Sequence, residues 1–297
     1  MESQNTLMLK AAFSIASKTG ADAVLLHADP LEDFNYAERI PKKPELILLT
    51  RKKRPEAGED DKASLVSHAK AVITLPRSAL TRIAIIKISA TLALSQELLK
   101  PGARVVFAVG GPEGNAIDLI QSVDTSRESE IITGRGIMKI SEAVQPEIFQ
   151  SVLNLAIELA DKGREGKPIG TIFVVGDHEK VLQLSKQMIM NPFKGYDEEE
   201  RNVLHPGLKE TIREFSAMDG AFVIADDGTV LSAGRYLGAA IDESQLPRGL
   251  GSRHIAAAGI TSLTSAVAFV ISESSGDVRI FKDGQIIMHI EKAPTKK

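Results

Sequence analysis

Four short apolar runs, rich in β-branched residues, follow one another through the first 110 residues, and a longer polar or amphipathic stretch separates each from the next. The runs are ADAVLLHA (21–28), PELILLT (44–50), KAVITLP (70–76) and ARVVFAVG (103–110). Apolar runs of this length are typical of buried strands, and their alternation with helices is typical of a mostly parallel sheet covered by helices. We therefore expect residues 1–142 to form an α/β domain, with a mostly parallel sheet between helical layers.

Two of the intervening stretches, 78–99 and 115–123, are predicted to be helical. The glycine-rich run AVGGPEG (108–114) would then join a strand to a helix, and the N-terminus of a helix can bind an anion. The run matches neither G-x-G-x-x-G nor a P-loop, and any tight turn favours glycine. A phosphate site and a plain turn are both compatible with this segment.

The second half of the chain shows a different pattern. Gln145-Pro146 predicts the start of a helix, and Gly163 predicts its end. A strand at 170–177 and helices at 179–190 and about 208–216 are expected next. Asp227-Gly228 and Asp283-Gly284 each lie between apolar runs and predict hairpin turns, so antiparallel pairs are expected here and not in the first domain. We predict a second domain at 143–297, an α/β fold with a mixed sheet.

Composition limits the classes of function. The 297 residues are 43% hydrophobic, carry a net charge of -3 and include no cysteine. The absence of cysteine excludes disulfides, thiolate metal sites and cysteine nucleophiles, and it fits a reducing compartment. No concentrated basic face and no apolar run of spanning length occur along the chain, so neither a nucleic acid nor a membrane is expected as a partner. We expect a cytoplasmic protein.

The first candidate for chemistry is Asp219-Gly220-Ala221 at the entry to an apolar strand. Two small residues let a ligand approach the backbone, and the carboxylate can bind a divalent metal or accept a hydroxyl proton. A structural role is the alternative: Asp219 caps the preceding helix and Gly220 turns the chain.

The second candidate is Gly251-Ser252-Arg253-His254. Backbone N–H groups, a hydroxyl, a forked guanidinium and an imidazole in succession suit the oxygens of a triphosphate. The alternative is an arginine–histidine pair on the surface. The third candidate is Glu273, which follows an apolar strand and is either a second metal ligand or an exposed strand-end residue.

The order and spacing of these segments resemble the diadenylate cyclase (DAC) domain family. The resemblance spans roughly residues 145–290 and rests on five segments: NPFKGY (191–196), DGA (219–221), Tyr236-Leu237, GSRHIAAAGIT (251–261) and VISESSG (270–276). With an α/β domain in front that is similar to the C-terminal domain of pyruvate kinase, the whole chain is most similar to the archaeal diadenylate cyclases.

The resemblance implies that two ATP molecules are condensed into cyclic di-AMP, a second messenger, with release of two pyrophosphates. Asp219 would act with a divalent ion, Mn²⁺ or Mg²⁺, to activate the attacking 3′-hydroxyl, and Glu273 would be a second ligand of that ion. Arg253 and His254 would bind phosphates and complete the catalytic set with Asp219. The remaining nucleotide contacts implied by the resemblance are Gly220, Ala221, Tyr236, Leu237, Gly251, Ser252 and Ser265.

Two positions depart from the family pattern. Ile255 stands where the bacterial motif has a second arginine, and Ser265 stands where some members have an acid. Because cyclic di-AMP is two-fold symmetric, two domains must meet face to face, so a homo-oligomer is expected. Two alternatives remain: a non-catalytic sensor of adenine nucleotides, which Ile255 favours, and another ATP-dependent nucleotidyltransferase.

Overall fold

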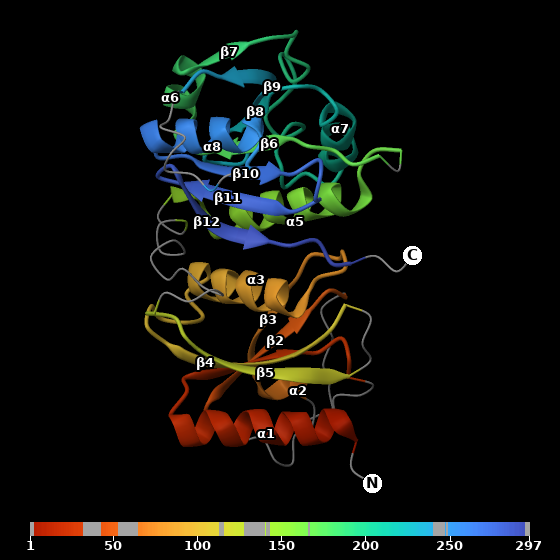
Figure 1. Cartoon of the computed structure of the whole chain (residues 1–297), viewed down its shortest axis with the longest axis vertical. Helices are drawn as coiled ribbons and strands as arrows, with labels where there is room; N and C mark the ends of the chain where they lie inside the picture. The colour runs from red at the N-terminus through yellow and green to blue at the C-terminus, as the bar shows by residue number, and fades with distance from the viewer. Residues whose placement is uncertain are drawn as a thin grey trace. The chain divides into compact units, whose positions relative to one another are not determined.

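The computed structural model describes residues 3–31, 43–52, 65–112, 116–127, 140, 143–165, 167–239, 247 and 249–294. The chain divides into two compact units, one of Met1–Arg135 with Ala293–Lys297 and one of Gly136–Lys292 (Figure 1). The boundary that we expect at residues 142–143 remains a prediction, and residue 142 lies outside the described residues. No helix in the described ranges has the length and apolar character needed to cross a membrane.

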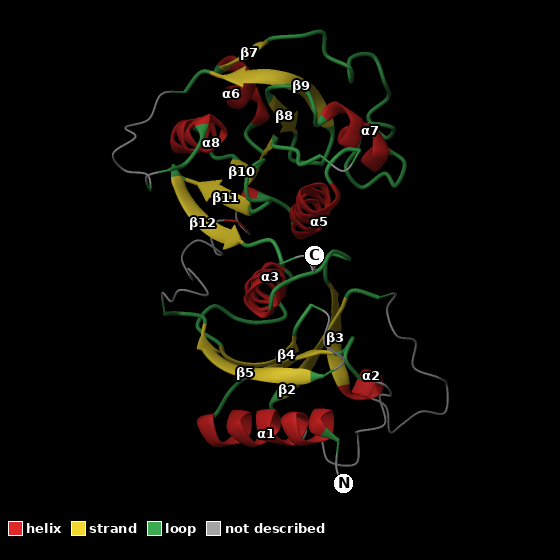
Figure 2. Ribbon diagram, turned by 45° about the vertical axis from the view of Figure 1, so that its right-hand side comes forward, coloured by secondary structure: helices red, strands yellow, loops and turns green. Residues whose placement is uncertain are grey.

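The first unit contains a five-stranded sheet in the order β3-β2-β1-β4-β5. The pairs β1–β2, β1–β4 and β2–β3 are parallel, as expected. Helices α1 and α3 cover opposite faces of this sheet, which confirms the helix–sheet–helix layering (Figure 2). The elements are α1 (Gln4–Thr19), β1 (Ala23–His27), β2 (Glu45–Thr50), α2 (Leu65–His68), β3 (Ala69–Thr74), α3 (Arg82–Ser95), β4 (Arg104–Gly110) and β5 (Ile117–Asp124).

The prediction of a helix at 115–123 is wrong for those residues of the stretch that the structure describes. Residues Ile117–Asp124 form strand β5, which is antiparallel to β4, so this unit also has the antiparallel pair that we did not expect. Ile117 and Val123 point into the core, while Asp118 and Ser122 are exposed. In the described residues, the run that begins at Ala108 is followed by strand β5 and not by a helix, so no helix N-terminus that could bind an anion follows it there.

The second unit contains a seven-stranded sheet in the order β12-β11-β10-β6-β8-β9-β7. Only β6–β8 is parallel among its strand pairs in the described residues, so the sheet is mixed, as expected. Figure 2 shows α5 and α8 on opposite faces. The elements are α5 (Pro146–Lys162), β6 (Ile172–Val175), α6 (His178–Gln183), β7 (Ser185–Gln187), α7 (Leu208–Phe215), β8 (Ala221–Ile224), β9 (Val230–Leu237), α8 (Ser252–Leu263), β10 (Val267–Ile271), β11 (Val278–Lys282) and β12 (Gln285–Ile290).

Local signals explain most of these boundaries. Pro146 begins α5, Gly163 ends it, and both predicted hairpins form. The long helix expected at 179–190 is wrong, because α6 ends at Gln183 and β7 follows it. The Ser185 hydroxyl donates to the Val181 carbonyl, and β7 pairs with β9 at the edge of the sheet.

Candidate active site

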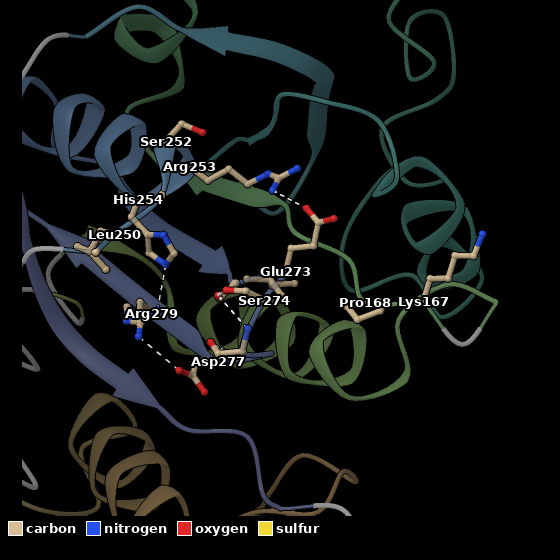
Figure 3. A pocket seen from close by; sticks show the side chains of 15 residues that line it. Lys167, Pro168, Leu250, Ser252, Arg253, His254, Glu273, Ser274, Asp277 and Arg279 are labelled. Carbon is tan, nitrogen blue, oxygen red and sulfur yellow. Dashed lines mark hydrogen bonds and ion pairs between the residues drawn. The ribbon is translucent and has the colours of Figure 1, made fainter.

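A cavity of about 920 Å³ lies at one edge of the second unit's sheet (Figure 3). Its walls are the first turn of α8, the residues that follow β10, Arg279 of β11, and Lys167-Pro168 ahead of β6. In the strand register, Ile172 is opposite both Ala221 and Val270. The starts of β6 and β8 therefore meet the end of β10, which brings three distant segments of sequence together.

Arg253 links the predicted carboxylates at this edge. Its Nη1 donates to Glu273 Oε2 at 2.9 Å, and its Nη2 lies 3.5 Å from Asp219 Oδ1 (Figure 3 shows the contact with Glu273). The Asp219 side chain is 91% exposed, so a ligand can reach it. The fold thus brings together Asp219, Arg253 and Glu273, three of the residues that we singled out in the sequence; Arg253 and Glu273 line the cavity, and Asp219 does not.

The N-terminus of α8 contributes partial positive charge to the cavity. Gly251 precedes the helix without a side-chain cap, and no acidic residue lies in the first turn. Gly251, Ser252 and Arg253 all line the cavity. Because the first N–H groups of a helix lack partners within it and carry partial positive charge, this arrangement favours an anion.

His254 lies in the wall of the cavity with its side chain buried. Its Nε2 lies 3.1 Å from Nη1 of Arg279, whose Nη2 lies 3.3 Å from Asp277 Oδ2. Burial lowers the pKa of His254 from 6.5 to about 4, and the nearby charges of Arg279, His289 and Arg253 contribute. His254 is therefore neutral at pH 7.

Asp277 anchors this group of side chains. Its carboxylate contacts the His289 ring at 3.1 Å and accepts from the Lys292 backbone N–H at 3.2 Å. Burial by itself would raise the pKa of Asp277, but these hydrogen bonds outweigh burial and lower the pKa. Asp277 therefore stays ionised and holds Arg279 in place.

Gly220 and Ala221 have a structural role in the sheet. Gly220 has a φ of +104°, and a Cβ there would lie 2.7 Å from the backbone nitrogen of Arg235 on β9. Ala221 is fully buried and begins β8. The small residues of this segment thus permit the close approach of β9, and any contact with a nucleotide remains a prediction.

Tyr236, Leu237 and Ser265 do not line the cavity. Tyr236 is 60% exposed on β9, and Leu237 is buried in the core. Both follow Arg235, which is opposite Ala221, so they share a sheet edge with Asp219. Ser265 lies before β10, at the far end of that strand from Glu273, and its backbone N–H donates to Asp177. The roles expected for these residues remain predictions.

Several residues of the cavity wall were missed in the sequence, among them Lys167, Asp277 and Arg279. Gly170, which lies beside Arg253 without lining the cavity, was missed as well. A Cβ at Gly170 would lie 2.6 Å from Nη1 of Arg253, so the glycine leaves room for that guanidinium. A glycine directly before an apolar strand is a signal that could have identified it. Nothing in the local sequence distinguishes Lys167, Asp277 or Arg279 from other charged residues.

Asp219 and Glu273 carry the type of ligand group, a carboxylate, that divalent ions bind. Mg²⁺ is commonly bound by one or two carboxylates together with substrate phosphates and water. Asp219 and Glu273 contact the two terminal nitrogens of the same guanidinium, so both carboxylates lie beside Arg253. The described part of the chain has no group of three or more His, Cys, Asp or Glu that could hold a metal, so other ligands would come from substrate or water.

The fold and the cavity define an α/β protein of two units, with a pocket at a helix N-terminus of the second that is lined by Lys167, Arg253 and Arg279 and by the carboxylates of Glu273 and Asp277. A family model described as "DisA bacterial checkpoint controller nucleotide-binding", the DAC model, matches residues 158–286. A second model, described as "Probable sensor domain DacZ_P", matches residues 4–133.

Two curated relatives are named diadenylate cyclase. The protein from Methanocaldococcus jannaschii is 39% identical over 200 residues, which cover 67% of this chain and 63% of that protein. The protein from Haloferax volcanii is 36% identical over 199 residues, which cover 67% of this chain and 72% of that protein. A solved structure of DacA from Staphylococcus aureus, a double mutant, is 24% identical with a TM-score of 0.33, covering 47% of this chain and 84% of that one. The chain belongs to the diadenylate cyclase family.

Proposed function

We propose that this protein is a diadenylate cyclase that condenses two ATP molecules into cyclic di-AMP and releases two pyrophosphates. The observation that carries the proposal is the position of Arg253, held between Asp219 and Glu273 beside the cavity at the start of α8. Phosphoryl transfer chiefly requires aligned reactants and neutralised charge, which carboxylates, a guanidinium and helix N–H groups can supply.

In each half of the reaction, the 3′-hydroxyl oxygen of one ATP forms a bond to the α-phosphorus of the other. The bond from that phosphorus to pyrophosphate breaks, and the hydroxyl proton passes to the Asp219 carboxylate. Arg253 and the first N–H groups of α8 neutralise charge on the phosphates. A Mn²⁺ or Mg²⁺ ion held by Asp219 and Glu273, when bound, would supply further positive charge at the reacting phosphate.

The symmetry of the product determines the assembly. One site holds one ATP, and its 3′-hydroxyl cannot attack in line the α-phosphate of that same nucleotide. The second units of two chains must therefore meet face to face, so the active species is a homo-oligomer. The partners that we propose are ATP and a second copy of the chain, and no nucleic acid or membrane has a part in the reaction. We place the enzyme in the cytoplasm, where ATP is formed and used.

The deciding experiment is chromatography with mass detection of the products from ATP with Mg²⁺ or Mn²⁺. Cyclic di-AMP and pyrophosphate are expected. Asp219→Asn should lower turnover by roughly 10²-fold while ATP still binds. Asp226→Asn is the matched control, because Asp226 lies beyond the other end of β8 and contacts only His178 as an ion pair in the described structure.

The other outcomes separate the remaining classes of function. If folded protein with either metal binds ATP but leaves it intact, the protein is a nucleotide sensor. If AMP is transferred to another acceptor, it is a different nucleotidyltransferase. Equal turnover by Asp219→Asn and the parent would show that Asp219 is only structural.

We further propose that the two units have different roles, catalysis and regulation. The second domain carries the reaction, and the first, matched by a model described as a sensor domain, regulates it. A fragment of residues 136–297 should unfold cooperatively and form cyclic di-AMP. A fragment that folds and dimerises but forms none would show that the first domain supplies part of the site.

A further inference from the structure

Arg279 extends from β11 into the wall of the cavity beside His254 (Figure 3). Its side chain is 17% exposed, and it is held from both sides: Nη1 contacts His254 Nε2 at 3.1 Å, and Nη2 donates to Asp277. His289 and the backbone N–H of Lys292 fix Asp277 in turn. The Arg279 guanidinium therefore has a defined orientation before any ligand binds.

The contact between Arg279 and His254 determines where the imidazole carries its proton. An arginine has only N–H donors, so Nε2 of His254 must be the acceptor. The ring is buried, with Arg279 in contact and the charge of Arg253 nearby, and it is neutral, as its lowered pKa of about 4 indicates. A neutral imidazole whose Nε2 accepts carries its proton on Nδ1.

The Nδ1 atom of His254 is buried and has no hydrogen-bond partner among the residues that the structure describes. An N–H group buried without an acceptor is unfavourable, and most such groups in folded proteins have a partner. Nδ1 has almost no accessible surface in the free protein, so an oxygen removes that penalty only if the bound ligand shifts the ring or the atoms that cover Nδ1. The cavity beside the ring is lined by Arg253 and by the start of α8, both of which favour an anionic oxygen.

We propose that Arg279 is a positioning residue that holds His254 as the Nδ1–H tautomer, so that Nδ1 donates to a phosphate oxygen of the bound nucleotide. The identity of this ligand rests on the proposed function, whereas the tautomer is a property of the free protein. Arg279 also supplies a guanidinium beside His254 from another strand, although the next residue along the chain, Ile255, has none.

Nitrogen NMR of the full chain tests the tautomer directly, with the His254 signals identified by their loss in His254→Gln. In the parent at pH 7, Nδ1 should be protonated and Nε2 should be an acceptor. Arg279→Met removes the donor, so the ring should exchange between tautomers. Arg279→Gln keeps an N–H donor without the charge and should restore the parent tautomer. Arg201→Met is the control, because Arg201 is equally 17% exposed and bonds the Val230 carbonyl away from the cavity.

Inorganic pyrophosphate is the probe for the second half of the proposal. Its binding should shift the Nδ1 proton signal of the parent, and Arg279→Met should bind pyrophosphate about tenfold more weakly, the effect of one lost hydrogen bond. Arg279→Gln and Arg201→Met should stay within about threefold of the parent.

The outcomes that overturn the proposal are distinct. A parent protein with its proton on Nε2 refutes it, whether or not any variant folds, and so does Arg279→Met with an unchanged Nδ1–H tautomer. Pyrophosphate that binds without altering the Nδ1 proton shows that Nδ1 is not the donor. If the tautomer responds to Arg279→Met as expected but ATP yields no cyclic di-AMP, the positioning role stands and the proposed function fails.

Discussion

The guanidinium of Arg253 occupies the space that a side chain at Gly170 would take: a Cβ at residue 170 would lie 2.6 Å from Nη1 of Arg253 and 2.9 Å from the Cβ of Glu273. Gly170→Ala should therefore push the tip of Arg253 away from Glu273. The tip of Arg253 is flexible but the Cβ of Glu273 is not, so the free energy of unfolding should fall by about 1 kcal/mol, while turnover should fall about tenfold. Urea unfolding and steady-state kinetics on one preparation check both values. Parental turnover would show that the exact position of Arg253 is unimportant.

Substitution of Gly220 should cost more stability, because all of its nearest neighbours are backbone atoms. With a φ of +104° and the Arg235 nitrogen 2.7 Å from the position of a Cβ, Gly220→Ala should lower the free energy of unfolding by about 3 kcal/mol. Gly195→Ala is the control: Gly195 has a φ of +92° with no atom within 4 Å of its Cβ position, so it reports backbone strain alone. Equal losses of stability in the two variants would contradict a role for the contact with β9.

Lowering the pH should destabilise the protein through the buried imidazole of His254. Burial, with the nearby Arg279, His289 and Arg253, lowers its pKa from 6.5 to about 4, so the unfolded chain takes up this proton at a higher pH than the folded chain does. Between pH 6.5 and 4 the unfolded state binds more protons, so the free energy of unfolding should fall as the pH is lowered, by about 3 kcal/mol in total. Urea unfolding at several pH values should show a shallower dependence in His254→Gln. The same slope in parent and variant would count against the lowered pKa.

Mixing two inactive variants tests whether Asp219 and Arg253 act on one nucleotide. They approach to 3.5 Å within one chain, so both should serve the same ATP. A mixture of Asp219→Asn and Arg253→Ala should then form no cyclic di-AMP and should accumulate at most the linear intermediate. Recovery to about half of the parental rate would mean that an intact composite site forms across the interface.

Activity per molecule should also depend on encounter between protomers. Specific activity is expected to rise with protein concentration until the active pair saturates, because each 3′-hydroxyl must reach the α-phosphate on the other copy. A dilution series with sedimentation analysis compares activity with the fraction of dimer. Constant activity from a species shown to be monomeric would refute the face-to-face arrangement.

Structural features that depend on residues close together in the chain could be predicted from the sequence. The buried strands β1, β2 and β4, the ends of α5 and both hairpin turns follow from apolar runs, proline, glycine and Asp-Gly pairs, and the structure confirms them. The run at 70–76 contributes strand β3, but β3 lies at the edge of the sheet and only Ile73 is buried in it. Asp219, Arg253 and Glu273 could be singled out because their residue types and order suit phosphate chemistry. The prediction of secondary structure failed where the local pattern is compatible with both a helix and a strand. Ile117–Asp124 is a strand because β4 offers it an edge, and pairing with a strand elsewhere is not encoded locally.

Only the tertiary structure decided which charged residues face the cavity. Arg279 and Asp277 resemble other polar residues in sequence, yet the register of β10, β11 and β6 brings them to His254 and to the start of α8. The same register separates Ser265 from Glu273 by the length of β10. The sequence by itself determined the elements and the chemical groups, because these depend on side-chain type and local spacing. The fold alone determined which groups meet, because contacts between distant segments are set by strand pairing and packing.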